Sequence, residues 1–405
     1  MNSINVLNNN EKGKNQKIKS LYNLGNIKSN YILAKIFNYL QKVKSLKIVQ
    51  HNKNTQKKLN ITINYYKEYK DIYSPIEIEL IPLENSYGEF INILNENDKI
   101  YYHIYFNDNY KEIKRTYIDK NDKIKKIKII IDYQVKTLSK LFFNNITIES
   151  INFKKFYRNN IDNMSDMFSG CYLLKEINFS SFNTNNVTDM SNMFYKCSSL
   201  NKLDLSNYNT NKVINMSYMF QDCKSLKEIN IPNFSFSKVN NMSYMFNQCE
   251  SLEEISFPKL NEINETIKPF IIDMSFMFFG CYSLKKIDLP NFNNIFANMS
   301  YMFCHCKSLK VLDISNFINV CASETRCMFA ICLSLEVLDL SNLNFRNTID
   351  LSKMFYNCTS LKELNLSEIS EYKRADTNEM FRNCSDELKT KIKNKFNNLN
   401  RFAFM

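Results

Sequence analysis

The chain has 405 residues, 44% of them hydrophobic, which is enough apolar surface for a large core but more length than one ordinary compact domain uses. Its five glycines, six prolines and three histidines are too few and too widely spaced for a glycine-rich phosphate loop or a multi-histidine metal or catalytic site. The formal net charge of +12 comes mainly from the amino-terminal part, where the lysine run from Lys12 to Lys67 contains no arginine, so a specific nucleic-acid site is not expected.

The first 136 residues divide into a polar start and two patterned segments. Residues 1–27 are rich in lysine and asparagine, and we expect a flexible N-terminus there. Apolar residues at helical spacing from Ile32 to Val49 predict two or three short helices within residues 30–60. Residues 28–136 are therefore expected to form a helical, then β-rich N-terminal cap that covers the first edge of the remaining chain. Its strands are predicted at Ile76–Ile81, Phe90–Leu94, Ile100–Phe106 and Ile124–Ile131.

Nine cysteines recur through the rest of the chain at a nearly constant interval. The intervals are 26, 26, 26, 32, 25, 26, 26 and 26 residues, which indicates an internal repeat rather than a disulfide framework. We expect a solenoid of about ten such units over residues 137–384. The cysteines are Cys171, Cys197, Cys223, Cys249, Cys281, Cys306, Cys332, Cys358 and Cys384.

One unit, Asp189–Ile214, shows how a repeat is built. From Met190 onward, Met, Met, Phe and Cys lie at i, i+3, i+4 and i+7, which predicts the apolar face of a short helix. An Asn or Asp precedes this face in eight of the nine units, as expected for an N-cap. The pattern L-x-x-L-x-L from Leu200 then predicts a short strand. Stacked units give an α/β repeat solenoid, in which a parallel sheet faces a wall of short helices and the cysteines are small buried hydrophobes.

The last residues are expected to close the array. Ser385, Asp386 and Glu387 are residues that start a helix, and apolar residues follow at helical spacing. A repeat array needs its terminal core covered, so residues 385–405 are predicted to form a C-terminal capping helix.

The repeated motif resembles a known family. The segment M-S-x-M-F-x-x-C-x-S-L-K-x-L-D-L-S-N-F is similar to the 26-residue repeat of the BspA-like leucine-rich-repeat surface proteins, a domain-of-unknown-function family abundant in mycoplasma lipoproteins. The resemblance covers residues 137–385, and it implies a leucine-rich-repeat-like solenoid that serves in adhesion or protein binding and has no enzyme activity. The chain shows no signal peptide, lipobox cysteine or 18-residue apolar span, so we expect a cytoplasmic protein, with export to the cell surface by an unconventional route as the alternative.

A second resemblance lies in residues 30–60. An amphipathic helix, a lysine-containing turn and a second apolar cluster resemble an F-box, which would imply a ubiquitin-ligase substrate adaptor. A helical cap without a ligase role has the same pattern, so both interpretations stay open.

The outward positions of the predicted strands are the candidate binding site. Asp288, Asp313 and Asp339 fall at the same place in three successive strands, where they form an acidic strip or are neutralised by nearby lysines. We therefore predict a non-enzymatic scaffold that binds a protein partner on a concave strand face, with an adaptor and a BspA-type adhesin as alternatives. No catalytic, cofactor, metal or small-molecule site is expected. The predicted contact residues are Asp204, Glu228, Lys286, Asp288, Lys310, Asp313 and Asp339.

Overall fold

The computed structural model of the protein describes residues 29–30, 32–33, 53–258, 271–367, 375–396 and 399–405. The chain forms two compact units, Met1–Ser74 and Pro75–Met405. Helices α4 (Lys53–Lys58) and α5 (Ile63–Tyr73) belong to the first unit. The F-box-like pattern falls mostly on residues 34–52, which lie outside the described residues. None of the described helices is long and apolar enough to cross a membrane.

The second unit begins with a mixed sheet. β1 (Ile76–Pro82) pairs with β5 (Ile127–Ile131) on one side and with β6 (Ile148–Lys155) on the other, both antiparallel. β6 pairs in parallel with β7 (Glu176–Asn178). Ile76, Ile78 and Leu80 of β1 are buried, as their alternation predicts. The strands, in spatial order, are β3 (Tyr102–Phe106), β5 (Ile127–Ile131), β1 (Ile76–Pro82), β6 (Ile148–Lys155) and β7 (Glu176–Asn178).

Three of the predicted strands differ from the structure: Phe90–Leu94 is wrong, and the strands predicted at Ile100–Phe106 and Ile124–Ile131 begin later, at Tyr102 and Ile127. The segment Phe90–Leu94 is not a strand; only β2 (Gly88–Glu89), just before it, pairs with β4 (Tyr117–Ile118). Residues 100 and 101 belong to the 3-10 helix η2 (Glu96–Tyr101), because Asn95 caps its first turn by accepting a hydrogen bond from the Asn97 N–H. The alternation of apolar residues, on which the strand prediction was based, does not reveal such a helix cap.

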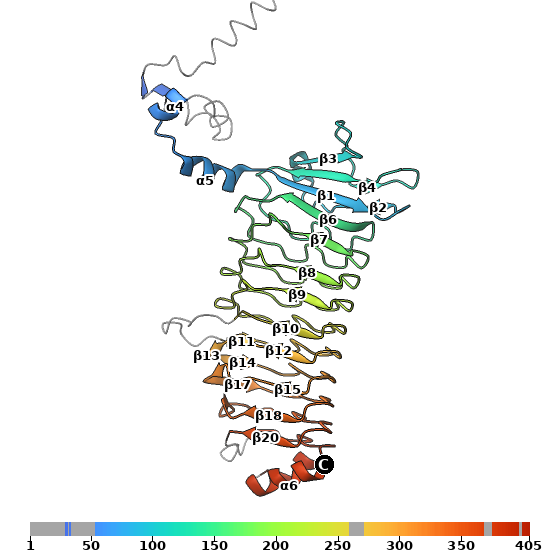
Figure 1. Ribbon diagram of the computed structural model, residues 1–405, viewed down its shortest axis with the longest axis vertical. Helices are drawn as coiled ribbons and strands as arrows, with labels where there is room; N and C mark the ends of the chain where they lie inside the picture. The colour runs from blue at the N-terminus through green and yellow to red at the C-terminus, as the bar shows by residue number, and fades with distance from the viewer. Residues whose placement is uncertain (1–28, 31, 34–52, 259–270, 368–374, 397–398) are drawn as a thin grey trace, which may run out of the picture. The chain divides into compact units, whose positions relative to one another are not determined.

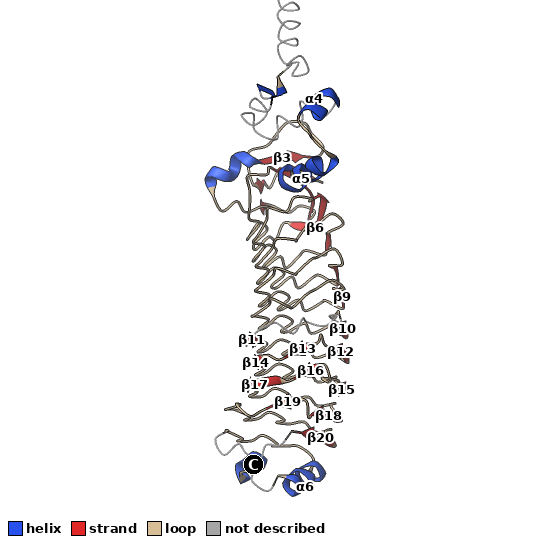
Figure 2. Cartoon of the chain, turned by 90° about the vertical axis from the view of Figure 1, so that its left-hand side faces the viewer, coloured by secondary structure: helices blue, strands red, loops and turns tan. Residues whose placement is uncertain are grey.

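The remainder of the unit confirms the prediction of a parallel-strand solenoid: each repeat forms one coil, and successive coils stack (Figures 1 and 2). Strands at one place in successive coils form a ladder that we call the strand face. It follows a nearly straight column in both Figure 1 and Figure 2, without the concave curvature that was expected. After β6 and β7 its strands are β8 (Lys202–Asp204), β9 (Glu228–Asn230), β10 (Glu254–Ser256), β12 (Lys286–Asp288), β15 (Val311–Leu312), β18 (Val337–Leu340) and β20 (Glu363–Leu366).

Two further parallel ladders link the later coils. In Figure 1 they lie to the left of the strand face. One consists of β11 (Ile271–Asp273), β14 (Phe296–Asn298), β17 (Val320–Glu324) and β19 (Leu343–Asn344), and the other of β13 (Phe292–Asn293) and β16 (Phe317–Ile318).

The predicted helix of each repeat is wrong: the segment is a succession of β-turns. Within one coil the Met193 N–H donates to the Met190 carbonyl at 3.3 Å, whereas the Phe194 N–H donates to Met219 of the next coil at 2.8 Å. The third residue of the first turn, Asn192, has a φ of 55°, the left-handed conformation that type II turns require there. Half of the amides therefore join neighbouring coils, whereas an α-helix would use them internally. We call this part of each coil the turn segment.

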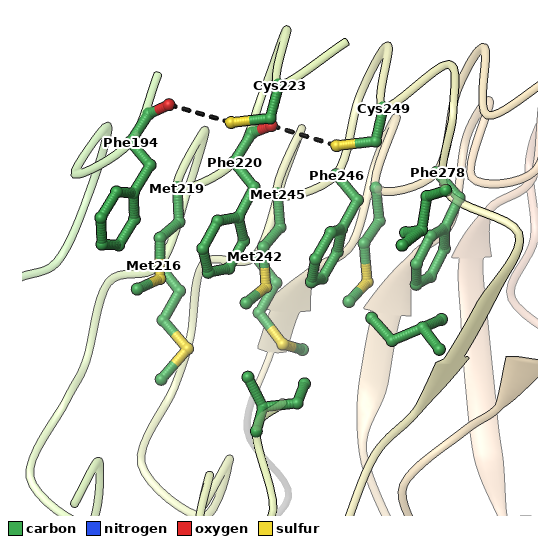
Figure 3. Packing of buried hydrophobic residues seen from close by; sticks show 14 of the residues in the cluster. Phe194, Met216, Met219, Phe220, Cys223, Met242, Met245, Phe246, Cys249 and Phe278 are labelled. Carbon is green, nitrogen blue, oxygen red and sulfur yellow. Dashed lines mark hydrogen bonds between the residues drawn. The ribbon is translucent and has the colours of Figure 1, made fainter. Parts of the chain in front are cut away.

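The turn segments bury a continuous column of phenylalanines (Figure 3). Adjacent rings stack at centroid distances from 5.0 Å (Phe220 and Phe246) to 5.7 Å (Phe329 and Phe355). Each column ring contacts the ring one coil away, so the column joins the coils into one core. Its members are Phe142, Phe168, Phe194, Phe220, Phe246, Phe278, Phe303, Phe329, Phe355, Phe381 and Phe404.

The repeated cysteines are buried, as predicted, but they are more than small hydrophobes. The Cys223 thiol donates a hydrogen bond to the Phe194 carbonyl oxygen of the preceding coil at 3.1 Å (Figure 3), and the other eight do the same with 3.0–3.2 Å distances. A cysteine satisfies this site because it is small, apolar and still a weak donor.

The carboxyl-terminal segment closes the array. Helix α6 (Asp386–Lys395) starts after Ser385, whose hydroxyl oxygen accepts the Leu388 N–H, and it buries Leu388 and Ile392. The 3-10 helix η3 (Arg401–Phe404) then takes the place of a further turn segment. The Ala403 carbonyl accepts the Phe381 N–H at 2.7 Å, and Phe404 is the last ring of the column.

We expect the cysteines to differ sharply in reactivity. Burial raises the pKa of Cys281 to about 12 and of Cys384 to about 11, so at pH 8 these thiols stay protonated and unreactive. Of the 12 cysteines, Cys321 alone is not fully buried. A maleimide should therefore label Cys321 rapidly in the native protein and all 12 in denaturant. Rapid native labelling of the repeat cysteines would contradict the packing described above.

Candidate functional site

The strand face carries the predicted polar column. Asp204 lies opposite Asn230, Ser256 opposite Asp288, and Asp288 opposite Asp313. Further along, Asp339 lies opposite Asn365. The constant repeat length therefore sets the register of the side chains across coils, as the sequence predicts.

Three of these aspartates are held by their own turns. The carboxylates of Asp204, Asp313 and Asp339 accept the N–H of the serine two residues later at 3.0, 2.8 and 2.8 Å. Hydrogen bonds from Ser206 lower the pKa of Asp204, and those from Ser341 lower the pKa of Asp339. These hydrogen bonds favour the ionised forms of Asp204 and Asp339.

The predicted contact residues fall into two groups. Asp204 and Glu228 lie on β8 and β9, where Glu228 is already paired with Lys202 at 2.7 Å. The other five lie together on and beside β12, β15 and β18, separated from the first group by β10. They are Lys286, Asp288, Lys310, Asp313 and Asp339.

Neutralisation by lysine is weak in the second group. Lys286 lies 3.7 Å from Asp288 in an exposed pair, while Lys285 is bound to Glu253 at 2.6 Å. Lys310 makes no ion pair within the described part of the chain. The lysines of this group therefore neutralise Asp288 only weakly.

Sequence reasoning missed two exposed valines in this group. Val311 and Val337 lie opposite each other in β15 and β18, and their exposed fractions are 63% and 45%. Each is two residues from an aspartate of the column, Asp313 or Asp339. The sequence could have revealed them by comparison of equivalent repeat positions, because the other coils of the strand face have a polar or charged residue at this position. Those residues are Ser150, Glu176, Lys202, Glu228, Glu254, Lys286 and Glu363. We call Val311, Val337, Asp313 and Asp339 the valine patch.

The turn segments offer a different surface, a half-buried aromatic ladder. Tyr218, Tyr244, Phe276 and Tyr301 stack almost in parallel at 4.5–4.7 Å. Because the ring faces contact one another, only the edges and the ends of the ladder face outward. The ladder therefore stabilises the coils and presents little ring face to a ligand.

A groove of about 730 Å³ lies on the strand face between β9 and β10. It is lined by residues 227–232 and 253–258, and its charged side chains are those of Lys227, Glu228, Glu253 and Glu254. Among the described residues there is no group of three or more His, Cys, Asp or Glu side chains that could hold a metal ion.

One comparison with known proteins matches the repeat region of the chain. The model of a family described as "Mycoplasma protein of unknown function, DUF285" matches residues 136–257 and 272–395. No curated protein matches the chain. Among solved structures, an internalin (inlF) from Listeria monocytogenes is 13% identical over 54% of this chain and 72% of its own. The TM-score is 0.20, so we draw no conclusion from this match.

Proposed function

The chain belongs to the DUF285 family of mycoplasma proteins of unknown function, and from this premise we propose that it is a non-enzymatic scaffold that binds a protein partner on its strand face. The valine patch is the observation that carries the proposal. Two aliphatic side chains are exposed next to each other on the strand ladder, and the carboxylates of Asp313 and Asp339 lie two residues away on the same strand segments. Protein interfaces commonly have this arrangement, an apolar centre within a polar rim.

The charges of the patch indicate the character of the partner. Asp288, Asp313 and Asp339 form one row beside the valines, and Lys286 and Lys310 lie at its edge. A partner that places an apolar side chain over Val311 and Val337 would bring lysine or arginine against the aspartates. Such rim charges act mainly on the association rate and on specificity.

Cross-linking tests this placement. The full chain would be incubated with native lysate, treated with an amine-reactive cross-linker and analysed by mass spectrometry. We expect intermolecular cross-links at Lys286 and Lys310, which border the valine patch. Lys140 and Lys353 serve as internal controls because they lie in turn segments. Cross-links that gather at the turn-segment lysines, with none at the strand face, would overturn the proposal.

A further inference from the structure

The groove between β9 and β10 lies where the strand face is interrupted. β8 pairs with β9 and β10 pairs with β12, but β9 and β10, although adjacent in Figure 1, are not hydrogen-bonded to each other. The groove runs along six residues of each strand segment, which corresponds to about 20 Å. A slot of this length fits an extended chain better than a compact small molecule.

Two prolines explain why Asn230 and Ser256, which border the groove, make no hydrogen bond to the turns that follow their own strands. In β8 the Ser206 N–H binds Asp204, but the equivalent positions after β9 and β10 are Pro232 and Pro258, which have no N–H to donate. Asn230 and Ser256 are therefore not tied to their own turns.

The polar side chains that border the groove bind to the neighbouring strands on either side of it and not to each other. The Asn230 amide donates to Asp204 on the β8 side at 3.0 Å, and the Ser256 hydroxyl donates to Asp288 on the β12 side at 2.8 Å. Two of the charged side chains follow the same division, because Glu228 pairs with Lys202 and Glu253 with Lys285. Lys227, on the β9 side, attracts Glu253 electrostatically without forming an ion pair with it. No side chain of these pairs bridges the groove.

One carboxylate in the groove has no partner. Glu254 is exposed, and its side chain makes no hydrogen bond or ion pair within the described part of the chain. Three of the four charged residues that line the groove are acidic, while Pro232 and Pro258 make its other end apolar. The groove thus has an acidic end and an apolar end, about four residues apart on an extended strand.

We propose that this groove binds an extended peptide segment of the partner protein, with a lysine or arginine against Glu254 and an apolar side chain, about four residues away, between the two prolines. This inference rests on the proposed function, and it names the chemistry of one part of the partner. The groove is a second contact in addition to the valine patch, and β12 lies between the two.

A random dodecapeptide library displayed on phage is the probe. Selection would use the immobilised full chain, and enriched peptides would be counter-screened on Glu254→Lys. Glu176→Lys is the matched control, since Glu176 holds the equivalent strand position on β7, is exposed and lies outside the groove. We expect enriched peptides to carry a basic residue with an apolar residue about four positions away. They should lose at least about tenfold in affinity on Glu254→Lys and bind Glu176→Lys unchanged.

Two outcomes of this selection would contradict the proposal. Peptides that bind Glu254→Lys as well as the unaltered chain, or no enrichment at all, would overturn the groove assignment. Peptides that ignore Glu254 but are lost on Val337→Lys would overturn the groove while leaving the proposed function intact.

Discussion

Replacing Phe246 by alanine is expected to lower the free energy of unfolding by about 3–5 kcal/mol. The ring is fully buried, stacks on Phe220 and Phe278 at 5.0 and 5.5 Å, and meets Phe257 edge-on. Its loss removes apolar contact from two neighbouring coils at once, and the stacked coils cannot collapse around the gap without breaking the turn hydrogen bonds.

Chemical denaturation followed by circular dichroism measures this loss. Tyr110→Ala is the control, because it also removes an aromatic ring, but one that is 98% exposed. The Phe246→Ala midpoint should fall well below that of both the unaltered chain and the control. Equal midpoints for the two variants would show that the phenylalanine column does not hold the coils together.

The sequence predicts the architecture because the repeat encodes it many times over. The cysteine spacing sets the coil length, and the coil length sets which residues face each other across strands, as with Asp288 and Asp313. The buried positions follow from the same pattern, since Met190, Phe194 and Cys197 are all fully buried. The predicted domain boundaries and the cytoplasmic location remain predictions.

The secondary structure of the repeat could not be predicted in the same way. A spacing of i, i+3, i+4 and i+7 suits a helix, yet here a chain of β-turns places the same side chains inward. The distinguishing feature is backbone conformation, with Asn192 and Lys196 at φ of 55° and 58°. Polar residues at these places are compatible with both structures, so the sequence does not exclude the competing helical interpretation.

The candidate site was predicted in part for a physical reason. Charged residues on a strand are expected to face solvent, so Asp313 and Asp339 were identified, whereas valine in a strand is normally assigned to the core. The exposure of Val311 and Val337 follows from the register of the ladder. The groove depends on the directions taken by Asn230 and Ser256, which repeat spacing does not specify.

Replacing Val311 and Val337 together by lysine is expected to abolish most partner binding with little effect on the fold. Lys202 and Lys286 occupy the equivalent strand positions in other coils, so the ladder accepts lysine there. On the partner side, two charged ammonium groups would replace the apolar centre of the interface. Truncating or charging a central interface residue commonly costs about 1–3 kcal/mol or more, so the pair should lower affinity by at least about tenfold.

Quantitative affinity capture from native lysate with three full-length baits makes this measurement. The baits are the unaltered chain, the Val311→Lys/Val337→Lys double variant and Glu176→Lys, which changes the charge of the strand face away from the valine patch. The account predicts equal recovery of the same proteins by the first and third baits and at least about tenfold lower recovery by the double variant. Equal recovery by all three baits would contradict the proposal that the partner binds over the valine patch.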